Sequence, residues 1–140
     1  MEVWVENLEI PWSLLFLPDG RVLVSVSEKP GRIRLIQGRK LRGDPYATLN
    51  VAHVGERGLM GLALHPQFQK KPYLYAMFTY RKGNDLFNWV IRVKDLRDWG
   101  EFDKIILNEI PGGRFHNGGR IALVQLVQMS DFSRSFSANI

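Results

Sequence analysis

The residues best suited to chemistry stand in "RFHNGGRI", Arg114 to Ile121, where His116 and Asn117 precede two glycines. A neutral imidazole, with an unperturbed pKa of about 6.5, can accept a proton at neutral pH as a general base. The glycines would let a flat ligand approach the backbone, which a Cβ would obstruct. A histidine in a glycine-rich turn also commonly makes a hydrogen bond that stabilises the turn. The residues alone leave both roles open.

The remaining residue types exclude several kinds of site. The chain has no cysteine, so it has no disulfide, thiolate nucleophile or cysteine metal ligand. His53, His65 and His116 lack the close spacing of a zinc site, and we expect no metal site in this chain. We expect His65, in "LALHPQF", to anchor the junction between a strand and a turn. "GERG" and "PGGR" are too short for phosphate loops, and no Gly-Lys-Ser/Thr follows.

Short apolar or alternating runs separated by turn residues must position these groups, and they predict an all-β chain. Pro18-Asp19-Gly20 predicts a turn, because proline fixes φ and glycine supplies a positive φ. The four tryptophans are expected in the core or packed between strands. The expected strands are Trp12–Leu17, Arg21–Val26, Arg32–Ile36, two within Leu59–Tyr80, Asn88–Val93 and Lys104–Ile110.

The strand pattern repeats along the chain. Pro18 and Pro66 each open the turn after a strand, and they lie about 50 residues apart, which is the spacing of β-propeller blades. An immunoglobulin-like sandwich would also fit about seven short strands, but the repeat favours blades. We therefore predict an all-β partial β-propeller of about two and a half four-stranded antiparallel blades. A third unit should begin near "GGRIAL".

Three segments, in this order and spacing, resemble the start of the soluble quinoprotein glucose and aldose sugar dehydrogenases. They are "PWSLLFLPDGRVLVSVSEKPGRIRLI", "GERGLMGLALHPQF" and "HNGGRI". The resemblance covers roughly residues 2 to 122, and the family's chains are more than twice as long. It implies a six-bladed propeller that uses pyrroloquinoline quinone (PQQ) and calcium. The implied reaction oxidises the C1 hydroxyl of an aldose to the lactone, with hydride transfer to the quinone.

The resemblance also assigns residues. His116 would be the general base and Glu56 of "GERGLMGLA" would lie beside the sugar, where a carboxylate can accept hydrogen bonds from its hydroxyls. Arg120 and Asn117 would be supporting residues. The family's contacts to the quinone and its calcium ligands lie in later blades, so no cofactor-binding residue is assigned here. We therefore expect PQQ and calcium not to be held by these residues alone.

Propellers close with about 4–8 blades, and these residues hold fewer than three. The sequence therefore predicts either assembly with copies of itself or membership of a longer protein. We predict residues 1–122 to form the N-terminal blades and expect the isolated chain to be inactive. The alternative is a non-enzymatic β-rich module that self-associates through exposed strand edges, because unpaired edges recruit other strands.

The last residues, 123–140, do not follow the repeat. "LVQLVQM" and a serine-rich end stand where an apolar strand and a Pro-Asp-Gly turn are expected. Read one nucleotide later, codons for Phe-Gly-Pro-Asp give Leu-Val-Gln-Met, as at residues 126–129. Our hypothesis is a frameshifted tail, which further blades encoded in another downstream frame would support; a natural disordered end is the alternative.

The formal net charge is +5, and part of the surplus is local. A nucleic-acid surface is one interpretation, but no stacking aromatics are interleaved, which favours a hairpin with a solvated basic edge. No apolar run approaches the ~20 residues of a membrane span. No export signal opens the chain as written, whereas the family resemblance implies a periplasmic or extracellular location. The local basic residues are Arg32, Arg34, Arg39, Lys40 and Arg42.

Overall fold

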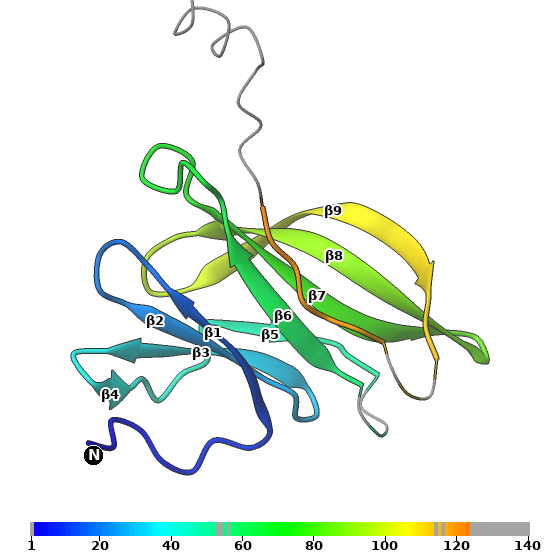
Figure 1. Cartoon of the computed structure of the whole chain (residues 1–140), viewed down its shortest axis with the longest axis horizontal. Coiled ribbons are helices and arrows are strands. Elements are labelled where there is room, and N and C mark those ends of the chain that lie inside the picture. Colours follow the sequence, from blue (N-terminus) through cyan, green and yellow to red (C-terminus); the bar gives the residue numbers. More distant parts are fainter. Residues whose placement is uncertain (1, 53–54, 56, 114, 116, 124–140) are drawn as a thin grey trace, which may run out of the picture.

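A computed structural model describes residues 2–52, 55, 57–113, 115 and 117–123. These residues form strands, turns and irregular segments arranged as two antiparallel sheets (Figure 1). The described residues contain no helix long and apolar enough to span a membrane. The predicted all-β partial propeller is confirmed, with each sheet corresponding to one blade.

The first sheet has the order β1-β2-β3-β4, and β5 also pairs with β3. The predicted strands of this unit are present, and Gly20 adopts the positive φ that the Pro-Asp-Gly turn requires. The short β5 was not predicted, because three residues carry no periodic signal. The strands are β1 (Pro11–Phe16), β2 (Val22–Val26), β3 (Gly31–Gln37), β4 (Lys40–Leu41) and β5 (Ala47–Leu49).

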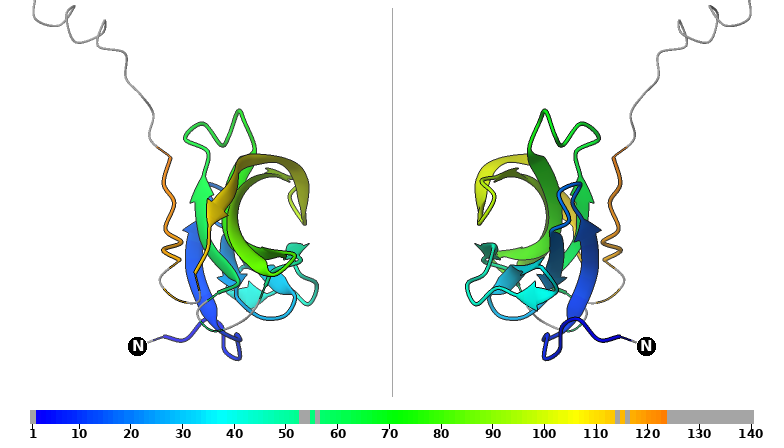
Figure 2. Two further views of the ribbon diagram at one scale, coloured as in Figure 1. Left: turned by 90° about the vertical axis from the view of Figure 1, so that its right-hand side faces the viewer. Right: turned by 90° about the vertical axis from the view of Figure 1, so that its left-hand side faces the viewer.

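The second sheet has the order β6-β7-β8-β9, and it curls strongly (Figure 2). Its last three strands are longer than the sequence predicts, because polar residues at their ends continue the pairing from Tyr73↔Lys94 to Lys82↔Asp85. The strands are β6 (Leu59–Leu64), β7 (Tyr73–Lys82), β8 (Asp85–Asp95) and β9 (Gly100–Pro111).

The main core lies between the two sheets. Leu23 and Ile33 of the first sheet pack with Leu59, Leu74 and Ile91 of the second, and all five side chains are almost fully buried. A smaller cluster on the outer face of the first sheet is partly covered by residues that precede β1. Because successive side chains of a strand point to opposite faces, the two faces of the first sheet belong to two different apolar clusters. The smaller cluster contains Val22, Val24, Val26 and Ile36, with Val5 and Leu8 packed against it.

The innermost strands lie side by side, as consecutive propeller blades require. The Leu62 amide of β6 donates to Ser13 Oγ of β1 at 3.4 Å. On the other side, residues 117–123 run along β6 (Figure 1). The predicted start of a third unit, Gly118–Leu123, takes no strand conformation, because no following strand in the described residues pairs with it. Residues 124–140, most of the predicted atypical tail, lie outside the described residues.

The expectation for the tryptophans is wrong in part. Trp89 packs edge-on against Phe78 at the core, whereas Trp4, Trp12 and Trp99 are 49%, 37% and 55% exposed. The Trp4 ring instead lies under the Arg39 guanidinium, 5.1 Å from the ring centre, and Trp12 faces a groove beside β1. Trp4 precedes the first strand, where no sheet covers it.

Candidate functional site

One loop precedes β6, and another precedes residues 117–123, the segment that runs along β6. These two loops carry the predicted site residues. Glu56 and His116 themselves lie outside the described residues, as does His53. The structure places their neighbours: Gly58, just before β6, and Asn117, just before the segment that runs along β6. Both loops therefore lead into adjacent inner segments from the same end of the sheets (Figure 1).

The Asn117 side chain is bonded to the backbone of Gly113, four residues earlier. Its Oδ1 accepts a hydrogen bond from the Gly113 amide at 2.9 Å, and its Nδ2 donates to the Gly113 carbonyl at 3.0 Å. One side chain thereby satisfies both polar groups of the same peptide residue, which fixes the two ends of the loop relative to each other. The geometry suits the supporting role that the family resemblance implies for Asn117.

The start of β6 and the loop before it are held by β2 of the first sheet and by the residue after β2. Ser25 Oγ donates to the Met60 carbonyl at 2.6 Å, and Ser27 Oγ donates to the Arg57 carbonyl at 3.1 Å. Both serines are buried, so these bonds replace hydration that the backbone carbonyls lose. Sequence reasoning missed this role, because alternating serines in a strand look like ordinary polar positions.

The two glycines of "HNGGR" have different structural roles. Gly118 has a φ of +71° and open space where a Cβ would point, so this side remains accessible to a ligand. Gly119 has a φ of +111°, and a Cβ there would lie 2.8 Å from Met60 Cβ and 3.1 Å from Trp12 Cη2. Gly119 is therefore needed for protein packing, whereas the sequence predicted a cofactor approach for both.

Arg120, the other predicted supporting residue, is exposed and lies over the Trp12 ring at 6.0 Å from its centre. This distance is at the limit of a cation–π contact, which contributes about 0.5–1 kcal/mol at exposed sites. Arg120 also lines the groove beside β1. It therefore stands at the inner face of the sheets, next to the loops.

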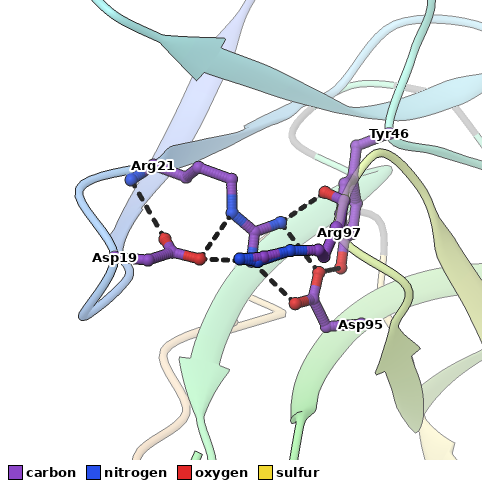
Figure 3. A network of polar contacts seen from close by, with 5 residues as sticks. All are labelled: Asp19, Arg21, Tyr46, Asp95 and Arg97. Carbon is purple, nitrogen blue, oxygen red and sulfur yellow. Dashed lines mark hydrogen bonds and ion pairs between the residues drawn. The ribbon is translucent and has the colours of Figure 1, made fainter. Parts of the chain in front are cut away.

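A buried ion-pair network joins the two sheets at their opposite end, where β1 and β6 finish (Figure 3). The Arg21 guanidinium donates two hydrogen bonds to Asp95, at 2.9 and 2.7 Å, and a third to Asp19 at 2.9 Å. The Tyr46 hydroxyl donates to Asp95 at 2.7 Å. Arg21 also donates to the Arg97 carbonyl. The network connects the β1–β2 turn with the end of β8.

The pKa values of this network follow from its contacts. Burial alone would raise the pKa of Asp95, but hydrogen bonds from Arg21 and Tyr46 outweigh burial and hold it below its ordinary value. The Arg21 hydrogen bond lowers the pKa of Asp19 as well. Burial, reinforced by Asp95, raises the pKa of Tyr46, so its hydroxyl stays protonated. The network is charged and fully paired at neutral pH, and it positions the sheets rather than the loops.

His65 lies at the same end as this network and takes the structural role expected for it. Its Nδ1 accepts a hydrogen bond from the Gln67 amide at 3.0 Å, at the turn after β6. Burial, with Lys71 and Arg92 nearby, lowers the pKa of His65, which favours the neutral ring that can accept this bond.

The described residues hold no group of three or more histidine or acidic side chains that could bind a metal ion. Calcium prefers six to eight oxygen ligands, so the described residues do not fit a calcium site. Arg120 is the one cationic side chain among the described residues that line the groove beside β1, and a single guanidinium does not fit the several carboxylates of PQQ.

The basic segment from Arg32 to Arg42 forms the β3–β4 hairpin, as predicted. Arg34 donates to two backbone carbonyls. Three of its arginines form ion pairs with carboxylates: Arg32 with Glu28 at 2.7 Å, Arg42 with Asp98 at 3.6 Å, and Arg39 with Glu2.

Two consecutive antiparallel blades, with one glycine-rich loop before β6 and another before the segment that runs along β6, define part of a β-propeller. Residues 8–130 match the Glucose / Sorbosone dehydrogenase family, so the chain belongs to this family.

Solved structures and a curated relative agree. An oxidoreductase of Thermus thermophilus, described as a glucose dehydrogenase, is 48% identical with a TM-score of 0.77, over 86% of this chain and 36% of that one. The PQQ-bound aldose sugar dehydrogenase of Streptomyces coelicolor is 30% identical with a TM-score of 0.73, over 87% and 37%. Quinoprotein glucose dehydrogenase B of Acinetobacter calcoaceticus is 25% identical, over 87% and 28%. The chain thus spans about a third of the length of these relatives.

Proposed function

We propose that this chain supplies the first two blades and the base-bearing loop of a quinone-dependent aldose sugar dehydrogenase, and that the isolated chain does not oxidise sugars. The observation that carries the proposal is the family match over residues 8–130, joined to a fold that brings the "GERG" and "HNGGR" loops to one end of the sheets. The PQQ-bound relative supports the cofactor class.

In this proposal His116 takes the proton of the sugar C1 hydroxyl on its neutral imidazole, and Glu56 accepts hydrogen bonds from another sugar hydroxyl. Asn117 acts as a supporting residue through its two hydrogen bonds to Gly113, which tie residue 117 to residue 113. Arg120 supports the inner face beside Trp12. General-base catalysis of this kind contributes about 10²–10⁴ in rate, provided that the base stays within hydrogen-bond reach of the substrate.

A chimera tests the proposal. Residues 1–123 of this chain would replace the matching N-terminal third of the 48% identical Thermus relative. With PQQ and calcium added, we expect aldose-dependent dye reduction by the chimera and none by the isolated chain. His116→Ala in the chimera should reduce the rate about 10²–10⁴-fold.

The matched control is His65→Ala, since His65 stands at the other end of the sheets. It should leave the rate of the chimera within about twofold, because it removes no group that reaches substrate. A His116→Ala chimera as active as its parent would refute the assignment of the base. Sugar oxidation by the isolated chain would refute the inactivity.

A second candidate function rests on an open apolar face. On β1, an edge strand of the first sheet, Leu14 and Phe16 are 59% and 66% exposed. They border a groove of about 1040 Å³ that Val22, Val24 and Trp12 also line. Contiguous apolar surface of this kind marks protein interaction sites. We propose that copies of this chain associate through the β1 edge and this face.

Light scattering separates a single chain of 16.1 kDa from an assembly. We expect a mass above that of one chain, reduced to one chain by Leu14→Glu with Phe16→Glu. Phe102→Glu, a change at a residue on β9 that is 57% exposed, is the matched control and should leave the mass unchanged. A single-chain mass at every concentration would remove this candidate.

A further inference from the structure

Two buried polar side chains lie opposite each other in the second sheet. Thr79 of β7 and Asn88 of β8 are directly paired in the antiparallel register and are 0% and 2% exposed. The Thr79 hydroxyl donates a hydrogen bond to Asn88 Oδ1 at 2.7 Å. Met77 and Val90, two residues along each strand and therefore on the same face of the sheet, are buried in an apolar cluster, so an unpaired hydroxyl or amide here would be costly.

Thr79 contacts the loop that carries Glu56. Its amide donates to the Gly58 carbonyl at 3.0 Å, and its carbonyl accepts from the Ala52 amide at 2.8 Å. Ala52 precedes the "GERG" segment, and Gly58 is its last residue. The backbone of one residue therefore fixes both ends of this loop to β7.

Asn88 contacts the loop that carries His116. Its Nδ2 donates to Asn117 Oδ1 at 3.4 Å, which is the longest bond of the series. The same Oδ1 accepts from the Gly113 amide, and Asn117 Nδ2 donates to the Gly113 carbonyl. The side-chain donors thus form a continuous series from the Thr79 hydroxyl through Asn88 Nδ2 to Asn117 Nδ2, which ends at the Gly113 carbonyl.

We propose that Thr79 and Asn88 are positioning residues that set the Glu56 loop and the His116 loop relative to each other. The catalytic meaning rests on the proposed function, because it requires Glu56 and His116 to act on one sugar. The physical coupling between the loops does not. A polar pair that only fills the sheet would end at Asn88, whereas this one continues at both ends into the two loops.

The coupling can be measured on the full chain by amide hydrogen exchange with NMR detection. Asn117→Ala removes the link to Asn88 at a surface position, and we expect exchange of the residue-79 amide, which bonds to Gly58, to rise about 2- to 10-fold, the range that the loss of one hydrogen bond produces. Thr79→Val keeps the shape of the side chain and removes its hydroxyl. In that background, Asn117→Ala should no longer affect the residue-79 amide.

Two further variants sharpen the test. Thr79→Ser retains the hydroxyl and should restore the response to Asn117→Ala. Asn88→Asp keeps the acceptor for Thr79 but places a carboxylate against Asn117 Oδ1, so it should raise exchange at both residue 79 and Gly113. If Thr79→Val does not fold, the responses to Asn117→Ala and Asn88→Asp in the otherwise unchanged chain decide the matter.

The proposal is overturned if Asn117→Ala leaves exchange at residue 79 unchanged, or changes it equally with and without the Thr79 hydroxyl. An equal rise at all amides of β7 and β8 would show a general loss of stability and would overturn it too. These readouts need neither sugar nor quinone. An inactive chimera with intact coupling would therefore count against the proposed function alone.

Discussion

Asp95→Asn tests how strongly the ion-pair network fastens the two sheets. The change keeps the size of the side chain but removes the negative charge that receives two hydrogen bonds from Arg21. The Arg21 and Asp95 side chains are 7% and 5% exposed. Removing one partner of a buried pair costs about 3–5 kcal/mol, because the other charge is left without compensation.

We expect a value near the lower end, about 3 kcal/mol, since Asp19 still neutralises part of the Arg21 charge. Small domains are stable by only about 5–15 kcal/mol. With a urea dependence of about 2 kcal/mol per molar, the unfolding midpoint should fall by about 1.5 M. Urea unfolding followed by circular dichroism measures this shift.

The control is Asp98→Asn, which breaks the exposed ion pair with Arg42 at 3.6 Å. It should change the free energy of unfolding by less than about 0.5 kcal/mol, since exposed pairs contribute little. If Asp95→Asn destabilises the chain no more than this control, the network does not hold the sheets together and the reasoning fails.

The same network sets a pH dependence. The pKa of Asp95 is lower in the folded chain than in the unfolded chain. Its contribution to the free energy of unfolding is therefore present at pH values above its ordinary pKa of 3.8 and is lost as the pH falls below that value, because the unfolded chain binds the proton first. Asp19 acts in the same direction, because its pKa is lowered too. Asp95→Asn should therefore make stability less dependent on pH below about 4, which urea unfolding at a series of pH values will show. An equally steep loss in the variant would contradict the assignment.

Two further predictions concern single positions. Gly61→Ala would drive a Cβ into the Gly119 carbonyl oxygen, so urea unfolding should show that the free energy of unfolding falls by about 1–3 kcal/mol. Gly43→Ala, with open space at that position, should change it by no more than about 0.5 kcal/mol. Equal effects of the two changes would mean that residues 117–123 do not pack on β6. Proton NMR should give His65 a titration midpoint below its ordinary pKa of 6.5, through burial and the nearby Lys71 and Arg92, and a midpoint above that value would place the ring in a different environment.

Much of the fold could be predicted because its signals are local. The strand around Leu23 and the turn at Gly20 follow from alternation and turn chemistry within a few residues. The partners of Arg21 could not be predicted, since Asp95 lies 74 residues away and only the packing of two sheets brings them together.

The candidate site, like the fold, could be predicted from the sequence only in part. The "HNGGR" and "GERG" motifs could be recognised, but the roles of Glu56 and His116 remain predictions, because these residues lie outside those that the structure describes. Thr79 and Asn88 were missed. In the sequence they look like ordinary polar residues of two strands, and their burial and pairing depend on the register between β7 and β8.

The division of the main core between both sheets has a consequence for synthesis on the ribosome. Leu23 and Ile33 leave the exit tunnel early, while Ile91, which belongs to the same cluster, is added about 55 residues after Ile36, near the end of β3. At about 5–20 residues per second, the apolar face of the first sheet waits roughly 3–11 s before this part of its cover is synthesised. A nascent chain in this interval offers a binding surface to chaperones, and slowing translation beyond Ile36 should lengthen its exposure to them.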